Sequence, residues 1–234
     1  KPTWKTLDDS RVMKNVIAST HRTTVMEWDQ FEVQILLGAD GDDAFWQRHV
    51  DALKRQALSQ YELHVTFKFY QKHGNFLPFN DLMRDGYHTG SEYLVRINDD
   101  TEFTSKGWMS LGVRTLQSFQ PPNVGVVGPS CAQGNTNIMT HDMVHRTHLD
   151  IFNTYYPPVF HNWYLDDWIS QVYGPARTKK IQSWTVIHHI EQQGQRYKAA
   201  LSDSMLLRRE IASGEKRMNA YLGVNDPTPS ASGS

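Results

Sequence analysis

The chain has 234 residues, of which 39% are apolar, enough for one sizeable hydrophobic core. Its 24 basic and 25 acidic side chains nearly cancel, which argues against a nucleic-acid surface, because such a surface needs a basic excess. Cys131 is the single cysteine, so no disulfide forms within the chain, and no apolar run reaches transmembrane length. We therefore expect one domain over residues 1–222, without nucleic-acid or membrane contact, and a disordered polar tail over 223–234.

Hydrophobic periodicity predicts alternating helices and strands in the first half of the chain. Helices are expected over 10–24, 45–61 and 80–90, and strands over 31–38, 63–69 and 93–97. Ser10 is a possible N-cap of the first helix. The first strand runs into an acidic turn that contains Asp40, and the third runs into Asn98, Asp99 and Asp100.

The second half continues the alternation. We expect helices over 107–119, 163–173 and 202–220, strands over 123–128 and 184–190, a polar loop over 130–137 and a His-rich segment of undetermined type over 139–152. Strands that alternate with helices predict an α/β layer fold with a largely parallel sheet. In such sheets ligands bind beyond the carboxyl ends of the strands, where both acidic turns fall.

Consecutive carboxylates at the end of a strand are suited to a divalent cation. Mg²⁺ and Mn²⁺ take oxygen ligands and are usually shared between one or two carboxylates and substrate phosphates. The alternative for Asp99 and Asp100 is an ordinary polar turn, because Asn and Asp favour turns. Two further pairs stand at the edges of expected elements: Asp166 with Asp167, and His188 with His189.

These pieces, in this order, resemble the nucleotide-sugar-dependent glycosyltransferases of the GT-A type. The stretch 96–101 is similar to that fold's DxD motif, the stretch 163–168 to its acidic motif at a helix start, and 39–43 and 188–189 to the ends of an early and a late strand. The segments 123–129 and 147–152 are similar to segments in the glycosyltransferase domains of large algal (chlorella) viruses and their cellular homologues. The resemblance covers residues 31–197.

The resemblance implies a GT-A-like, Rossmann-related sheet in a single domain, a nucleoside-diphosphate sugar donor (a UDP-sugar is favoured), a glycan or glycoprotein acceptor, and Mn²⁺ or Mg²⁺ as cofactor. A cellular form would work in the Golgi lumen, and a viral form in the host cytoplasm. Two departures stand out. Asn98 replaces the first carboxylate of the motif, and the family's first strand is not visible, so it lies upstream of Lys1 or the N-terminus is divergent.

By the same resemblance, the metal ligands would be Asp100, Asp99 and His189, with His189 favoured over His188 because it lies nearer the loop. Metal-bound diphosphate is a better leaving group. The donor itself would be held by a second group of residues: Asp40, Arg96, Asn98, Asp99, Arg196 and Tyr197. An Arg fork suits a phosphate well.

Asp167 is expected to act as the general base that deprotonates the acceptor hydroxyl, with Asp166 contacting the acceptor. A single base opposite the leaving group would invert the anomeric centre. Aromatic faces stack on sugar rings, which assigns four residues near the base to acceptor binding: Tyr155, Tyr156, Trp163 and Trp168. The alternatives are core packing for the aromatics and an N-cap role for one of the two Asp residues.

Other functions remain open from the sequence. A sugar nucleotidyltransferase would also use carboxylate-bound metal, but its Gly-rich triphosphate loop is not visible. A non-catalytic carbohydrate-binding homologue fits the aromatic content. A zinc site is a weaker alternative, because its candidate ligands lack an accompanying Cys cluster or HExxH pattern; these candidates are His141, Asp142, His145 and His148.

Overall fold

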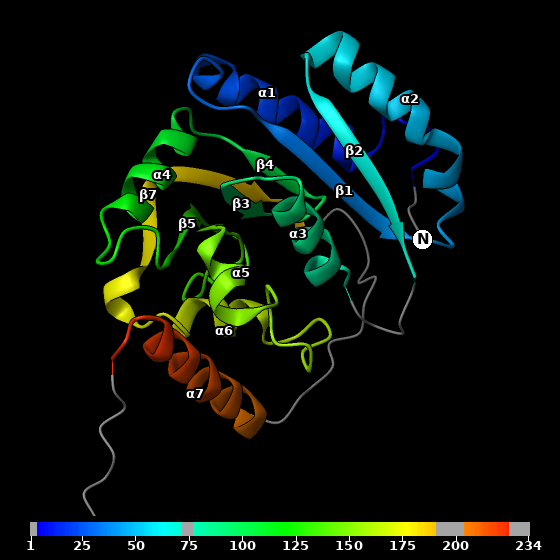
Figure 1. The fold of residues 1–234 in the computed structure, drawn as a ribbon. Helices are drawn as coiled ribbons and strands as arrows, with labels where there is room; N and C mark the ends of the chain where they lie inside the picture. The colour runs from blue at the N-terminus through cyan, green and yellow to red at the C-terminus, as the bar shows by residue number, and fades with distance from the viewer. Residues whose placement is uncertain (1–3, 72–76, 191–203, 225–234) are drawn as a thin grey trace, which may run out of the picture.

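The computed structural model describes residues 4–71, 77–190 and 204–224 of the chain. These residues form an α/β structure with a two-stranded sheet, a five-stranded sheet and flanking helices (Figure 1). Arg196, Tyr197 and residues 225–234 of the expected tail lie outside the described residues. No helix in the described ranges has both the length and the apolar character needed to cross a membrane.

The first part of the chain forms a small parallel sheet with a helix packed on it. In chain order its elements are η1 (Val12–Ile17), α1 (Ala18–Thr24), η2 (Val25–Glu27), β1 (Gln34–Asp40), α2 (Ala44–Tyr61), β2 (His64–Tyr70) and α3 (Phe79–His88). β1 and β2 pair in parallel over their full length. The Ser10 hydroxyl accepts a hydrogen bond from the Met13 N–H at 3.3 Å, although the N-cap position of η1 is Arg11 and not the expected Ser10.

The second part forms a five-stranded sheet in the order β3-β6-β5-β7-β4. Its elements are β3 (Tyr93–Arg96), β4 (Thr101–Phe103), α4 (Trp108–Gln117), β5 (Val126–Cys131), β6 (Asp142–His145), α5 (Thr147–Phe152), α6 (Leu165–Gln171), η3 (Pro175–Arg177), β7 (Thr178–His188) and α7 (Ser204–Tyr221).

The five-stranded sheet is mixed, so the predicted largely parallel sheet is not confirmed. Only β5 and β7 pair in parallel, whereas β6 runs antiparallel to both β3 and β5, and β4 runs antiparallel to β7. The physical reason lies in the His-rich segment, which returns directly from β5 as β6. A parallel neighbour needs a longer crossover, usually a helix, and the loop between β5 and β6 contains none.

Side chains alternate between the two faces of this sheet. Val127 and Met143 pack towards α4, where Phe103, Trp108 and Trp184 form a stacked aromatic ladder with ring centroids 4.6 and 5.1 Å apart. Their neighbours Val126 and Val144 pack on the opposite face, against α5 and α6. The sheet is therefore covered on both faces, which holds the ends of β3 and β7 in fixed positions.

Candidate functional site

The two acidic turns predicted from the sequence line one cavity. This cavity has a volume of about 1500 Å³, and its lining includes Asp40 at the end of β1 and Asn98, Asp99 and Asp100 in the turn after β3. β1 and β3 belong to different sheets, so the fold brings together two turns that are far apart in the sequence. Not every carboxylate of the first turn is available for binding, because Asp43 caps α2 by accepting the N–H groups of Phe45 and Trp46 at 3.0 and 3.2 Å.

Asp100 is held between two cationic or potentially cationic side chains. Its Oδ2 accepts from Arg11 Nη1 at 2.9 Å, and its Oδ1 lies 3.0 Å from Nε2 of His188. Burial opposes ionisation of this carboxyl, but the hydrogen bond from His188 and the charges of His188 and Arg11 outweigh it, so the pKa of Asp100 is lowered. Asp100 is therefore an ionised carboxylate that lies against Arg11 and His188.

His188, and not the favoured His189, reaches Asp100. His188 also lies 3.3 Å from the side-chain amide nitrogen of Asn98, whereas Nε2 of His189 lies 2.9 Å from Oε2 of Glu102. His188 is the last residue of β7 and His189 follows the strand, and the two imidazoles contact different carboxylates. Of the two, His188 is the one that contacts Asp100, and His189 as a metal ligand stays a prediction.

The described residues, as they are placed, do not fit a divalent cation. The charge of Arg11 lies against Asp100, with Nη1 2.9 Å from Oδ2. Within the described ranges, no three His, Cys, Asp or Glu side chains are grouped so that they could hold a metal ion. We therefore derive no chemical step through a metal from this geometry.

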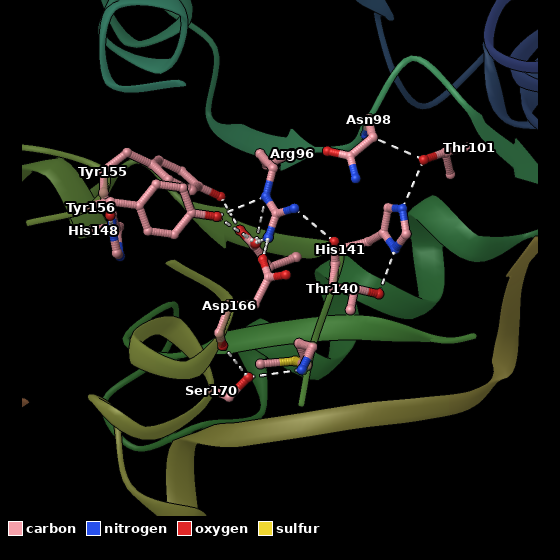
Figure 2. A network of polar contacts seen from close by, with 12 residues as sticks. Arg96, Asn98, Thr101, Thr140, His141, His148, Tyr155, Tyr156, Asp166 and Ser170 are labelled. Carbon is pink, nitrogen blue, oxygen red and sulfur yellow. Dashed lines mark hydrogen bonds and ion pairs between the residues drawn. The ribbon is translucent and has the colours of Figure 1, made fainter. Parts of the chain in front are cut away.

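Arg96, predicted to bind the donor, forms a buried polar network at the end of β3 (Figure 2). Its side chain is only 3% exposed and forms ion pairs with Asp142 at 2.8 Å and Asp166 at 2.6 Å. It also donates to the Tyr156 hydroxyl at 2.7 Å and to the Thr140 carbonyl at 2.6 Å. The Nε, Nη1 and Nη2 atoms of Arg96 all donate to groups within the protein. Arg96 therefore holds these side chains in position and is not an exposed phosphate ligand.

Asp142, which the sequence suggested only as a candidate zinc ligand, is the central acceptor of this network. It is fully buried on β6, and its carboxylate accepts from Arg96 and from the hydroxyls of Tyr155 and Tyr156. The only sequence signal was its position among the candidate zinc ligands. Asp142 is the first residue of β6, directly before the buried Met143 and Val144, and a buried carboxylate needs a partner because an unpaired charge there is costly.

The histidines of the zinc alternative are engaged in separate hydrogen bonds. Nε2 of His141 lies 2.7 Å from the Thr101 hydroxyl, which also accepts the backbone N–H of Asn98 at 3.2 Å (Figure 2). His148 lies 2.8 Å from the Tyr155 carbonyl and 2.9 Å from the Tyr173 hydroxyl. Burial lowers the pKa of His141 to about 2 and that of His148 to about 4, so both are neutral. His141 thereby fixes the turn that carries Asn98.

Asp166 and Asp167 lie in the first turn of α6. Neither is the N-cap, because Tyr164 occupies that position with a left-handed φ of 66° and no side chain caps the helix. Asp166 pairs with Arg96, whereas Asp167 is half-buried. Burial, followed by the charge of Asp166, raises the pKa of Asp167 above its ordinary value. A carboxylate with a raised pKa is suited to accepting a proton.

The aromatic residues assigned to the acceptor separate into two groups. Tyr155, Tyr156 and Trp168 are between 0% and 2% exposed and pack in the core, so their ring faces are covered by protein. Trp163, just before α6, is 43% exposed. The core-packing alternative therefore describes the first three, and Trp163 alone of the four presents a surface on which a sugar could stack.

Asp166 and Asp167 do not belong to the cavity lining within the described residues. The connection runs through Arg96, which joins Asp166 to the strand that leads into Asn98. The candidate site thus consists of the cavity lined by Asp40 and the turn after β3, together with the carboxylate pair on α6, which Arg96 connects to β3.

No protein-family model matches the chain, and the search of curated proteins gave no significant match.

Proposed function

We propose that the chain is a glycosyltransferase that moves a sugar from a nucleoside-diphosphate sugar, with a UDP-sugar favoured, to a hydroxyl of a glycan or glycoprotein. The observation that carries the proposal is the shared cavity of Asp40 and the turn Asn98–Asp99–Asp100. It combines hydrogen-bond acceptors from the ends of two strands with enough space for a nucleotide. The GT-A-like arrangement of the chain is part of this proposal.

In the proposed reaction, Asp40 accepts hydrogen bonds from the ribose or the base, and Asp99 from the ribose or the sugar. Both line the cavity. Asp100 is engaged by Arg11 and His188, so it stabilises the turn that positions Asp99. Positioning of this kind is a large part of catalysis, because a small displacement of a reacting group costs much of the rate.

Asp167 acts as the base in this proposal. It takes the proton of the acceptor hydroxyl while the oxygen forms a bond to the anomeric carbon. The bond between that carbon and the diphosphate oxygen breaks, and the nucleoside diphosphate leaves with the electron pair. The raised pKa of Asp167 supports this role, because a base is more effective when its pKa is closer to the working pH. Mn²⁺ or Mg²⁺ remains a prediction from the resemblance and enters no step here.

The experiment is a thermal-shift panel of UDP-, GDP- and TDP-sugars, each with and without Mn²⁺. A ligand that binds the folded state alone raises the melting temperature. We expect one nucleotide sugar to stabilise the protein and Asp99→Asn to remove that ligand-induced shift. The matched control is Asp51→Asn, a carboxylate on the exposed side of α2, which should keep it. If no nucleotide changes the melting temperature with or without Mn²⁺, the acidic turns are structural and the proposal fails.

A further inference from the structure

Two hydrogen bonds close the turn that follows β3. The N–H of Thr101 donates to the Asn98 carbonyl at 3.2 Å, as in a β-turn, and the N–H of Asn98 donates to the Thr101 hydroxyl, also at 3.2 Å. Asp99 and Asp100 are the two central residues of this turn. The Thr101 hydroxyl therefore holds the backbone that carries Asp99, which is one of the proposed donor-binding residues.

The hydrogen of this hydroxyl has one acceptor among the described residues, the imidazole of His141. Thr101 is 0% exposed, and Nε2 of His141 lies 2.7 Å from its oxygen. A buried hydroxyl that donates to nothing is costly, so the Thr101 O–H points at Nε2. The imidazole is neutral because burial lowers its pKa, so its single proton lies on Nδ1, which donates to the Thr140 hydroxyl at 3.0 Å.

His141 is itself fixed by the residues on both sides of it in the chain. Arg96 donates to the Thr140 carbonyl at 2.6 Å and forms the 2.8 Å ion pair with Asp142. Figure 2 shows the resulting series of contacts, which runs from Arg96 through Thr140 and His141 to Thr101. His141 is 1% exposed, so protein surrounds its ring. The orientation of the Thr101 hydroxyl is therefore set by the segment that leads into β6.

We propose that His141 is a positioning residue for the donor: its Nε2 accepts the Thr101 hydroxyl and so holds the turn in the conformation that binds the nucleotide sugar. The described lining of the cavity contains Asn98 and Asp99 but not His141, so the imidazole acts on the donor through the turn. Positions of binding groups matter because a small displacement weakens the contacts they make. The link to the donor rests on the proposed function, whereas the hydrogen bonds are tested without any ligand.

Two amide substitutions separate the roles of the two imidazole nitrogens. The end of a Gln side chain can take the place of Nε2 and that of an Asn side chain the place of Nδ1, so only His141→Gln keeps an acceptor for Thr101. We expect His141→Gln to bind UDP within about twofold of the wild type and His141→Asn about tenfold or more weakly in calorimetric titration. In initial rates the donor KM should rise for His141→Asn while the acceptor KM stays unchanged, which a loss of stability alone would not produce.

A second pair of variants tests Thr101. Thr101→Ser keeps the hydroxyl, whereas Thr101→Val has nearly the same shape without it. Amide exchange of Asn98, followed by NMR, reports its hydrogen bond to this hydroxyl in the absence of ligand. We expect exchange about tenfold or more faster in Thr101→Val and His141→Asn, and close to the wild-type rate in Thr101→Ser and His141→Gln. The ¹⁵N chemical shifts of the His141 ring should place its proton on Nδ1 in the wild type.

The outcomes distinguish this proposal from the proposed function. Circular dichroism checks that all four variants fold. If the wild type binds UDP and both His141→Asn and Thr101→Val bind it equally well, the positioning role is overturned and the proposed function stands. A proton on Nε2 of His141, or unchanged exchange of Asn98 in Thr101→Val, also overturns the positioning role. If the wild type binds neither UDP nor any other nucleoside diphosphate, the proposed function fails, and the role of His141 in donor binding fails with it.

Discussion

Arg96 Nη2 lies 2.6 Å from Oδ1 of Asp166, and this ion pair joins the strand that leads into Asn98 to the helix that carries Asp167. The same guanidinium contacts Asp142, whose side chain is fully buried. One buried cation therefore sets the relative position of the two parts of the proposed site. Its removal should affect stability first and activity through position, because its ion pairs with Asp142 and Asp166 lie within the protein.

Arg96→Met should destabilise the fold strongly. It leaves the Asp142 carboxylate buried without its cationic partner, and loss of one member of a buried pair costs about 3–5 kcal/mol. Urea denaturation measures the change in free energy of unfolding. The matched control is Arg22→Met, which breaks the 2.9 Å pair with Glu102, in which the Arg22 side chain is 52% exposed. This change should cost about 1 kcal/mol or less. Equal effects of the two substitutions would contradict the importance of burial.

The buried histidine His148 should make the fold less stable in acid. Its pKa is lowered by burial from 6.5 to about 4, so the unfolded chain binds a proton at this residue before the folded chain does. The free energy of unfolding therefore falls as the pH drops from about 6.5 to about 4, by up to ~3 kcal/mol. Urea denaturation across this range, on the wild type and on His148→Phe, measures the slope. The variant should show a shallower slope, and identical slopes would refute this assignment.

The two tryptophans near α6 should respond differently to truncation. Trp168 is 2% exposed, so Trp168→Ala should cost about 3–5 kcal/mol of stability. Trp163 is 43% exposed, so Trp163→Ala should change stability by about 0.5 kcal/mol and should weaken acceptor binding. Thermal denaturation and the KM for the acceptor are the two measurements. An unchanged KM in Trp163→Ala would remove this residue from the acceptor site.

Asp167→Asn should lower kcat by about 10²–10⁴ while donor affinity stays unchanged, since a general base acts on the acceptor proton and not on the nucleotide. Activity of the wild type should fall as the pH drops through the raised pKa of Asp167, because the protonated carboxyl cannot accept a proton. Initial rates across pH test both points, with Asp51→Asn on α2 as the matched control. A loss of donor affinity equal to the loss of rate would assign Asp167 to binding.

Local patterns in the sequence predicted most of the elements. The helix over 45–61 is α2, and the strand over 63–69 is β2 within a residue, because both segments have a clear hydrophobic periodicity. The three-residue strand β4 was missed, since a segment so short carries no period. The strand expected over 184–190 is β7, which starts earlier at Thr178 and so reaches further along the sheet.

Local patterns could not predict which strands pair or which side chains contact each other when they are distant in the sequence. The mixed sheet depends on how the His-rich segment returns as β6, and the partner of Arg96 lies 46 residues away on that strand. The choice between His188 and His189 depends on the register of β7 against β4, where His188 lies opposite Thr101. Arg11 contacts Asp100, which lies 89 residues further along the chain. No rule of sequence spacing predicts a contact between the start of a helix and a turn that far away.

The most direct measurement is the dissociation constant of UDP, by calorimetric titration, for the wild type, Asp40→Asn and Asp51→Asn. Asp40 and Asp99 line one cavity from different sheets, so both should contact a nucleotide bound there. We predict saturable binding to the wild type and to Asp51→Asn, and binding that is about tenfold weaker or more for Asp40→Asn, a loss of about 1.4 kcal/mol. Equal affinities for all three proteins, or no binding to the wild type of UDP or of any other nucleoside diphosphate, would contradict the account.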